Sequence, residues 1–144
     1  MLYRLLYSLL IYLALPIVLF ITYRKRPGQV GYQKRWPELL GWVPPLPSTA
    51  QPLWIHTVSV GESLAAIPLI RALKAANPEL PLLVTTTTRT GADQIAKLGD
   101  LVEHRYAPLD YPDAVWRFLQ RTRPRALVIM ETELWPNWLA ACAH

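Results

Sequence analysis

The feature that most constrains this chain is an uninterrupted apolar run near its N-terminus. No charged residue occurs among the nineteen residues from position 5 to position 23. As a helix with a rise of about 1.5 Å per residue, such a run would span about 28 Å, close to the roughly 30 Å hydrocarbon core of a bilayer. Tyr3, Tyr7 and Tyr23 lie near its ends, where interfacial aromatic residues concentrate. The run predicts a transmembrane helix over residues 1–24.

The residues that come after the run argue against a cleaved signal peptide, the alternative interpretation. A signal peptide carries its basic residues before the apolar run and a small-residue cleavage site after it. Here Arg24, Lys25 and Arg26 come after the run instead. Because positive charge marks the cytoplasmic side of a membrane segment, we expect a single-pass membrane anchor with residues 24 onward in the cytoplasm.

The charge distribution argues against nucleic acid as a partner. The formal net charge is +5, but residues 1–35 carry six basic and no acidic side chains, whereas residues 36–144 carry nine basic and ten acidic ones. A nucleic-acid-binding domain would carry its basic stripe on the folded part. The single cysteine, Cys142, excludes a disulfide framework and a cysteine zinc site within this sequence.

Residues 25–52 combine basic and aromatic side chains in a way that suits a lipid headgroup surface. We single out Lys34 and Arg35, beside Trp36, as candidate substrate-binding residues. An ordinary solvated linker would have a similar composition, so both interpretations stay open. The segment ends in prolines that stiffen its connection to the domain starting at residue 53: Pro44, Pro45, Pro47 and Pro52.

From residue 53 onward, apolar runs typical of strands alternate with helical segments. The predicted strands are 53–58, 82–86, 102–106 and 126–130, and the predicted helices are 62–76, 91–98, 111–121 and 135–143. Such alternation predicts a parallel sheet covered by helices on both faces, that is, a Rossmann-like α/β domain over residues 53–144. No cap or turn residue comes after the last helix, so we expect this domain to be the front part of a longer protein.

Ligands of open α/β sheets bind beyond the carboxyl ends of the strands, and two of the predicted strands lead into carboxylates there. Glu62 comes after the first strand, preceded by Ser59 and Gly61. The Ser59-x-x-Glu62 spacing is that of a helix capping box, and a general base is the functional alternative. Glu131 and Glu133 come after the fourth strand, where one of them serves either in catalysis or in supporting the next helix.

The second predicted strand runs into four consecutive threonines at positions 85–88. Hydroxyl groups and amides near a helix N-terminus suit an anionic group, which makes Thr86, Thr87 and Thr88 candidate substrate-binding residues. The alternative is β-propensity with a capping threonine at the end. The sequence contains neither a G-x-G-x-x-G motif after the first strand nor a P-loop, which disfavours dinucleotides and ATP. His56 lies within the first predicted strand, where we expect it to be packed, and His104 and His144 lack partners at metal-ligand spacing, so we expect no metal and no cofactor.

Taken in order along the chain, these segments resemble the 3-deoxy-D-manno-octulosonic acid (Kdo) transferases of lipopolysaccharide synthesis. The matching stretches are KRW at 34–36, HTVSVGESLAAIPLIRAL at 56–73, PLLVTTTTRTG at 81–91, APLDYPDAVWRFL at 107–119 and METELWPN at 130–137. One departure is Arg89, where the family often has proline.

The resemblance implies the N-terminal, acceptor-side half of a GT-B glycosyltransferase, whose C-terminal half lies outside this sequence. It implies inverting, metal-independent transfer of Kdo from the donor substrate CMP-Kdo to the lipid A precursor lipid IVA. Glu62 falls on the family's general base, and Glu131 falls on a position that stabilises the transition state. Two alternatives stay open: another membrane-associated GT-B glycosyltransferase, and a membrane-anchored binding domain without catalysis, in which Glu62 is only a cap.

Overall fold

The computed structural model describes residues 2–23, 33–47, 49–131 and 133–143. In chain order the elements are the helix α1 (Leu2–Tyr23), the 3-10 helix η1 (Gln33–Leu40), β1 (Leu53–Thr57), α2 (Val60–Ala76), β2 (Leu82–Thr86), α3 (Arg89–Ala96), the 3-10 turn η2 (Gly99–Leu101), β3 (Glu103–Tyr106), α4 (Pro112–Thr122), β4 (Ala126–Ile129) and α5 (Pro136–Cys142).

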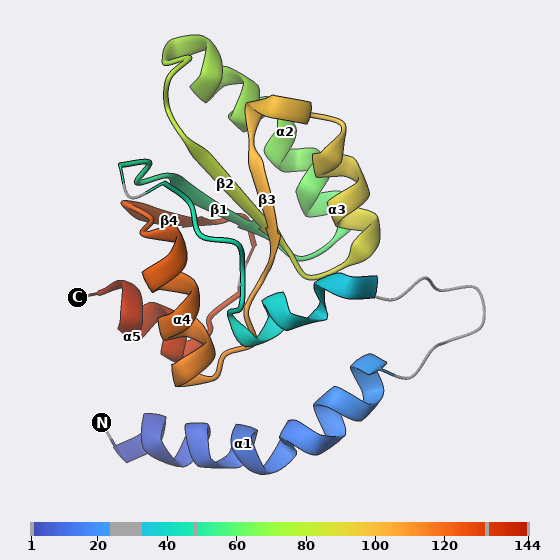
Figure 1. The fold of residues 1–144 in the computed structure, drawn as a ribbon, viewed down its shortest axis with the longest axis vertical. Helices are drawn as coiled ribbons and strands as arrows, with labels where there is room; N and C mark the ends of the chain where they lie inside the picture. Colours follow the sequence, from blue (N-terminus) through green and yellow to red (C-terminus); the bar gives the residue numbers. More distant parts are fainter. Residues whose placement is uncertain (1, 24–32, 48, 132, 144) are drawn as a thin grey trace.

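The four strands form one parallel sheet in the order β3-β2-β1-β4, which confirms the predicted α/β architecture. Helices α2 and α3 cover one face, and α4 and α5 cover the other (Figure 1). The chain first builds outward from β1 to β3 and then returns to place β4 on the other side of β1. The strand order therefore reverses between β1 and β4, which is where ligands bind in open α/β sheets.

Each face of the sheet has its own apolar core, as expected for strands that are covered on both sides. The core under α4 and α5 is built around the fully buried Trp54, Leu83, Val115, Phe118 and Trp138. The core under α2 and α3 includes Ile55, Ala66, Ile70, Val84 and Ile95. These two layers hold the strand ends, and hence the loops that extend from them, in fixed positions.

The structure does not support the predicted transmembrane helix over residues 1–24. Among the described residues, no helix is both long enough and apolar enough to cross a membrane. Helix α1 instead lies along the outside of the domain, beside η1, α4 and α5 (Figure 1). Polar side chains on one face of α1 bond to the domain. The Ser8 hydroxyl hydrogen-bonds to the Asn137 side chain, and the Tyr12 hydroxyl donates to the carboxylate of Asp113.

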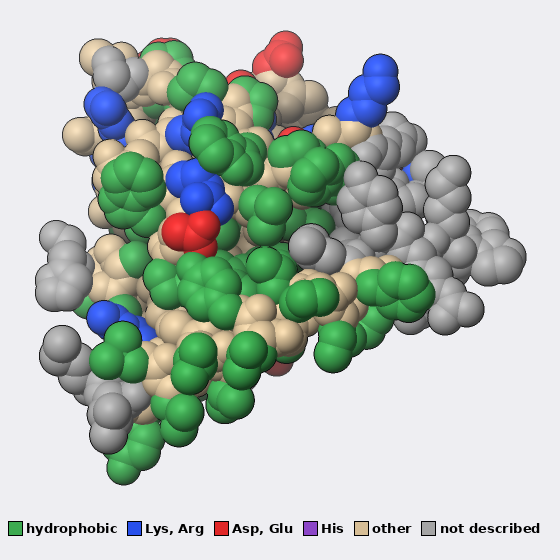
Figure 2. Space-filling view, turned by 60° about the horizontal axis from the view of Figure 1, so that its bottom comes forward, with side chains coloured by type: hydrophobic (Ala, Val, Ile, Leu, Met, Phe, Trp, Pro, Cys, Tyr) green, Lys and Arg blue, Asp and Glu red, His purple; other side chains and the backbone are tan. Residues whose placement is uncertain are grey.

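The opposite face of α1 is apolar and exposed. Leu13, Ile17 and Phe20 are 69%, 62% and 65% exposed, respectively, and Leu5, Leu6, Leu9, Leu10 and Ile21 are exposed as well. Figure 2 shows these side chains gathered along the helix. This is a far larger apolar surface than the scattered residues that a soluble domain ordinarily exposes.

The sequence pattern did not predict η1. This helix lies within residues 25–52, the segment expected either to lie at a lipid surface or to be a solvated linker. Its Glu38 is only 5% exposed, and its carboxylate accepts a hydrogen bond of 2.7 Å from the backbone N–H of Tyr106. Leu39 is buried with Tyr106 and Ala92. The segment thus packs onto β3 and α3. The basic triplet Arg24-Lys25-Arg26 lies outside the described residues.

Candidate active site

The carboxyl ends of β1 and β4 bring together the two carboxylate-bearing loops that the sequence singled out. The backbone N–H of Met130, at the end of β4, donates to the carbonyl of His56 in β1. Glu131 is therefore next to a residue that is paired with β1, and Glu62 lies in the first turn of the helix after β1. The two loops flank the point at which the strand order reverses.

Glu62 forms the capping box that its spacing predicted. The Ser59 hydroxyl accepts from the backbone N–H of Glu62, while the Glu62 carboxylate accepts from the backbone N–H of Ser59. The same carboxylate also accepts from the Ser59 hydroxyl at 2.9 Å and from the backbone N–H of Val58 at 2.6 Å. These donors hold a half-buried acceptor at the strand end. The capping role is present, and it leaves the proposed role as a base untested.

Hydroxyl groups connect the start of α2 to the end of β1, and the end of β1 to the start of α3. Ser63 Oγ lies 3.0 Å from Thr57 Oγ1 and donates to the carbonyl of Ser59. Thr88 caps α3 by accepting from Gly91 and also donates to the carbonyl of Val58. A Cβ at Gly91 would lie 2.9 Å from Ser63 Oγ and 3.0 Å from Thr88 Oγ1. Glycine thus permits the two helix N-termini to approach this closely.

The threonine run divides between the two faces of the sheet. Thr85 Oγ1 accepts from the Trp54 indole and lies 2.8 Å from His56 Nδ1, on the α4–α5 face. Thr86 Oγ1 lies 2.8 Å from His104 Nε2 on the other face. Thr86 is buried and Thr88 is a cap, so these two predicted substrate-binding threonines have structural roles. Thr87 is half-buried beyond the end of β2.

Two histidines in this region are held neutral. Burial lowers the pKa of His56 to about 4, and the nearby Glu62 carboxylate offsets only part of that effect. Burial also lowers the pKa of His104 to about 3, together with the positive charges of Arg35 and Arg105. Arg35 donates to His104 Nδ1, so the ring proton of His104 resides on Nε2 and points at Thr86. These side chains brace the end of β2 from both faces.

The loop that carries Glu131 and Glu133 leads into α5, whose start is fixed by a residue from elsewhere. The Asp110 carboxylate accepts from the backbone N–H groups of Asn137 at 3.1 Å and of Trp138 at 2.9 Å. Asp110 comes shortly after β3, so α4 and β4 separate it along the chain from the helix that it caps. Asp110 was not among the predicted site residues; the available signal was a carboxylate close behind a predicted strand.

Lys34 and Arg35, the predicted basic pair, have different surroundings. Lys34 is exposed. Arg35 is paired with the buried Glu38 through Nε at 2.6 Å and Nη2 at 2.9 Å, and its guanidinium lies over the Tyr106 ring. Arg35 therefore ties η1 to β3. Among the described residues, no group of three or more His, Cys, Asp or Glu side chains has the arrangement of a metal centre.

Several known proteins are similar to this chain. Residues 34–144 match the family model described as 3-deoxy-D-manno-octulosonic-acid transferase (kdotransferase). The chain is 42% identical over 147 aligned positions to a protein of Arabidopsis thaliana named as a probable mitochondrial 3-deoxy-D-manno-octulosonic acid transferase, with 98% of this chain and 32% of the relative covered. It is 37% identical over 141 positions to the Haemophilus influenzae 3-deoxy-D-manno-octulosonic acid transferase, with 94% and 32% covered. It is 44% identical over 99 positions to the Bordetella pertussis enzyme of the same name, with 64% and 22% covered.

Proposed function

Because this chain belongs to the 3-deoxy-D-manno-octulosonic acid transferase family, we propose that it is the N-terminal part of a glycosyltransferase that moves Kdo from CMP-Kdo to the lipid A precursor lipid IVA. The chain spans about a third of the length of the first two relatives, 32% in each case. The remaining wall of the active site, including much of the CMP site, would then come from a C-terminal half of GT-B type.

The observation that carries the proposal is the position of Glu62. It lies at the carboxyl end of β1, beside the point where the strand order reverses, in a chain whose family acts on Kdo. In the proposed step, Glu62 accepts the proton of the acceptor sugar hydroxyl as the hydroxyl oxygen bonds to the anomeric carbon of Kdo. The bond from that carbon to the phosphate oxygen of CMP breaks, CMP leaves with the electron pair, and the configuration inverts.

Glu131 supplies negative charge to the same step. As the bond to CMP breaks, the anomeric carbon gains positive, oxocarbenium-like character, which a fixed carboxylate stabilises. Glu131 is exposed at the end of β4, on the other side of the switch point from Glu62. The donor and acceptor themselves would be bound by backbone and hydroxyl groups around Ser59, Gly61 and Thr87, and the exposed Lys34 would meet an acceptor phosphate.

The acceptor is a lipid, and the outward face of α1 gives the protein a surface on which to meet it. We include in the proposal that this apolar face rests on the cytoplasmic leaflet of the inner membrane. A helix that lies in the interface buries its apolar face to a depth of about 5–10 Å. The acceptor headgroup would then reach the active site without leaving the membrane.

The test is a transfer assay on the natural gene product, including whatever chain extends past His144. The protein is incubated in detergent with lipid IVA and either CMP-Kdo or CMP-sialic acid, and mass spectrometry records the product. Addition of Kdo from CMP-Kdo alone supports the proposal. Transfer from the other donor would instead favour a different glycosyltransferase, and no transfer by a folded protein would favour the binding domain.

A further inference from the structure

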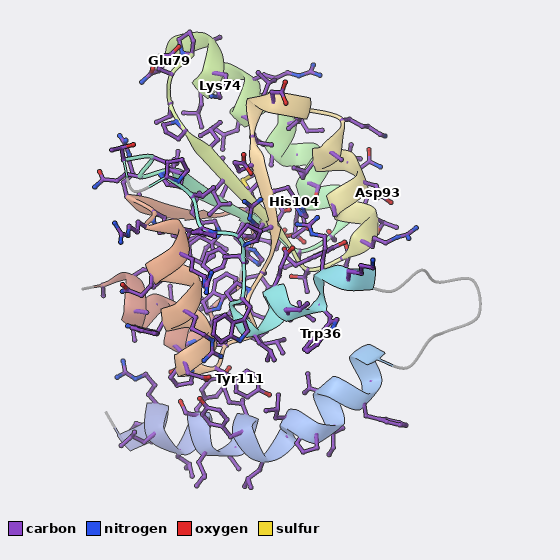
Figure 3. All side chains as sticks on the ribbon, viewed as in Figure 1. Trp36, Lys74, Glu79, Asp93, His104 and Tyr111 are labelled. Carbon is purple, nitrogen blue, oxygen red and sulfur yellow. The ribbon has the colours of Figure 1, made fainter. Side chains whose placement is uncertain are left out.

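One face of α1 directs polar groups toward the same edge of the sheet as the proposed active site. Tyr7, Ser8, Ile11 and Tyr12 recur at the spacing of a single helical face. Each contacts a residue that lies beyond the carboxyl end of β3 or β4. Tyr111, which receives two of these contacts, lies between the domain and α1 (Figure 3).

At the centre of this contact, Ser8 meets Asn137. Ser8 Oγ lies 3.3 Å from Asn137 Oδ1 and 3.2 Å from Asn137 Nδ2. Ser8 is 9% exposed and Asn137 is 5% exposed. Asn137 Nδ2 also donates to the backbone carbonyl of Asp110 at 2.7 Å. Both the oxygen and the nitrogen of a buried Asn amide need partners. The domain supplies a partner for Nδ2, and Ser8 supplies one for Oδ1.

Tyr7 contacts Asp110, the residue whose backbone carbonyl is bonded to Asn137. Its hydroxyl hydrogen-bonds to the carboxylate of Asp110, which is 5% exposed and caps α5 through Asn137 and Trp138. Ser8 and Tyr7 thus hold the two residues that fix where α5 begins. The loop that carries Glu131 ends at that point.

Two further contacts set the register of α1 against the domain. The Tyr111 hydroxyl donates to the backbone carbonyl of Ile11 at 2.9 Å, and the rings of Tyr12 and Tyr111 lie 5.0 Å apart. Tyr12 also bonds to Asp113 in the first turn of α4. A helix that only held the chain on a lipid surface would not need these directional bonds.

We propose that Tyr7 and Ser8 are positioning residues of the active site, acting through Asp110 and Asn137 on the start of α5 and thereby on the loop that carries Glu131. The role of Glu131 in this inference rests on the proposed function. The two faces of α1 then have separate tasks, since the outward face meets the lipid surface and the inward face orders the site.

The test compares variants of the two faces in the natural gene product. Tyr7→Phe combined with Ser8→Ala removes only the hydroxyl groups of the inward face. Leu9→Ser combined with Leu13→Ser alters the exposed face and serves as the matched control. Activity is measured in detergent micelles with lipid IVA, so that recruitment to a bilayer does not limit the rate.

We expect the inward-face variant to lose between about tenfold and a hundredfold in kcat, the range for a misplaced catalytic geometry, with little change in KM for CMP-Kdo. The outward-face variant should keep the kcat of the parent in detergent. The single variant Ser8→Thr retains a hydroxyl at position 8 and the native Tyr7. It should therefore keep much of the parental rate that the inward-face double variant loses. An unchanged kcat in a folded inward-face variant would overturn the inference.

A second measurement does not depend on the reaction. Amide hydrogen exchange over residues 133–143 should become faster by about tenfold in the inward-face variant and stay at the parental rate in the outward-face variant. If the parent transfers no Kdo, the proposed function fails while this exchange result still tests the positioning role. Equal exchange in all three proteins would contradict the positioning role whatever the activity.

Discussion

At the scale of single residues, the region around the proposed site depends on buried polar side chains, and one of them, His56, is held neutral. His56 is 1% exposed, its Nδ1 faces Thr85, and its ring meets Trp138 edge to face at 4.7 Å. Because the Trp54 indole can only donate to Thr85 Oγ1, the Thr85 hydroxyl hydrogen is free to bond to His56 Nδ1. Burial opposes a second proton on this ring more strongly than the nearby Glu62 carboxylate favours it.

The pKa of His56 makes the stability of the fold depend on pH. The pKa is lowered from 6.5 to about 4 in the folded state, so below pH 6.5 the unfolded chain binds a proton that the folded chain does not. Stability therefore falls as the pH drops from 6.5 to 4, by about 3 kcal/mol at 1.36 kcal/mol per pKa unit. His104, with a pKa of about 3, acts in the same direction.

Urea unfolding between pH 7 and pH 4 measures this effect. The His56→Gln variant should show a shallower fall in unfolding free energy over this interval than the parent, whatever its stability at pH 7. Identical pH dependence in the two proteins would show that His56 is accessible to protons in the folded state.

Single-residue roles were only partly predictable from the sequence. The spacing of Ser59 and Glu62 predicted the capping box, and the structure confirms it. Asp110 and Glu38 were not identified, because their partners lie 27 and 68 residues away in the sequence. Local spacing carries no information about contacts of that range. The pairing of Arg35 with β3 was missed for the same reason.

At the scale of elements, the strands and helices of the domain were predicted with boundaries shifted by only a few residues. The runs at 53–58 and 82–86 are continuous and apolar because helices cover both faces of the sheet, and such runs are readily recognised. The 3-10 helix η1 was missed because it contains Pro37 and packs through only part of its length. Tertiary contacts with β3 and α4, not local propensity, account for its position.

The end of η1 supplies a prediction at this scale. Gly41 has a φ of +79°, and a Cβ there would lie 2.1 Å from the carbonyl oxygen of Ala114 in α4. Gly41→Ala should therefore lower the free energy of unfolding by about 2–5 kcal/mol, through backbone strain and overpacking. Gly61→Ala is the matched control, since a Cβ there would meet only Ser59 Oγ at 3.8 Å.

Equilibrium unfolding in urea compares the two glycine variants. Gly61→Ala, in the first turn of α2, should change stability by no more than about 1 kcal/mol. If Gly41→Ala were as stable as Gly61→Ala, the close packing of η1 on α4 would be wrong.

At the scale of the whole molecule, α1 combines two patterns that the sequence presents as one. Its average apolarity dominates the pattern and predicted a membrane span, which the structure does not support. The polar positions that dock it, Tyr7, Ser8 and Tyr12, are few and are recognisable only once their partners on the domain are known. Averages over a window cannot distinguish a helix that is apolar all round from one with a narrow bonded face.

The outward face of α1 predicts binding to lipid. We expect the natural gene product to sediment with vesicles of phosphatidylethanolamine and phosphatidylglycerol, and the variant with serine at Leu9, Leu13 and Ile17 to remain largely in the supernatant. Each large apolar side chain withdrawn from water contributes about 1.5–3 kcal/mol, so three replacements should weaken binding at least a hundredfold. Equal sedimentation would assign lipid contact to another surface.

The central claim is that Glu62 is the base of a Kdo transfer reaction, and Glu62→Gln tests it most directly. Glutamine is accepted at this position of a capping box, so the variant should fold, although its single amide oxygen replaces only one of two accepting oxygens, while it loses the ability to take up a proton. Glu79→Gln, which removes an exposed carboxylate between α2 and β2 (Figure 3), is the control. We predict that Kdo transfer from CMP-Kdo to lipid IVA by the natural gene product falls about 10²–10⁴-fold in Glu62→Gln and is unchanged in Glu79→Gln. A folded Glu62→Gln variant with the parental rate would contradict the claim and leave Glu62 as a helix cap.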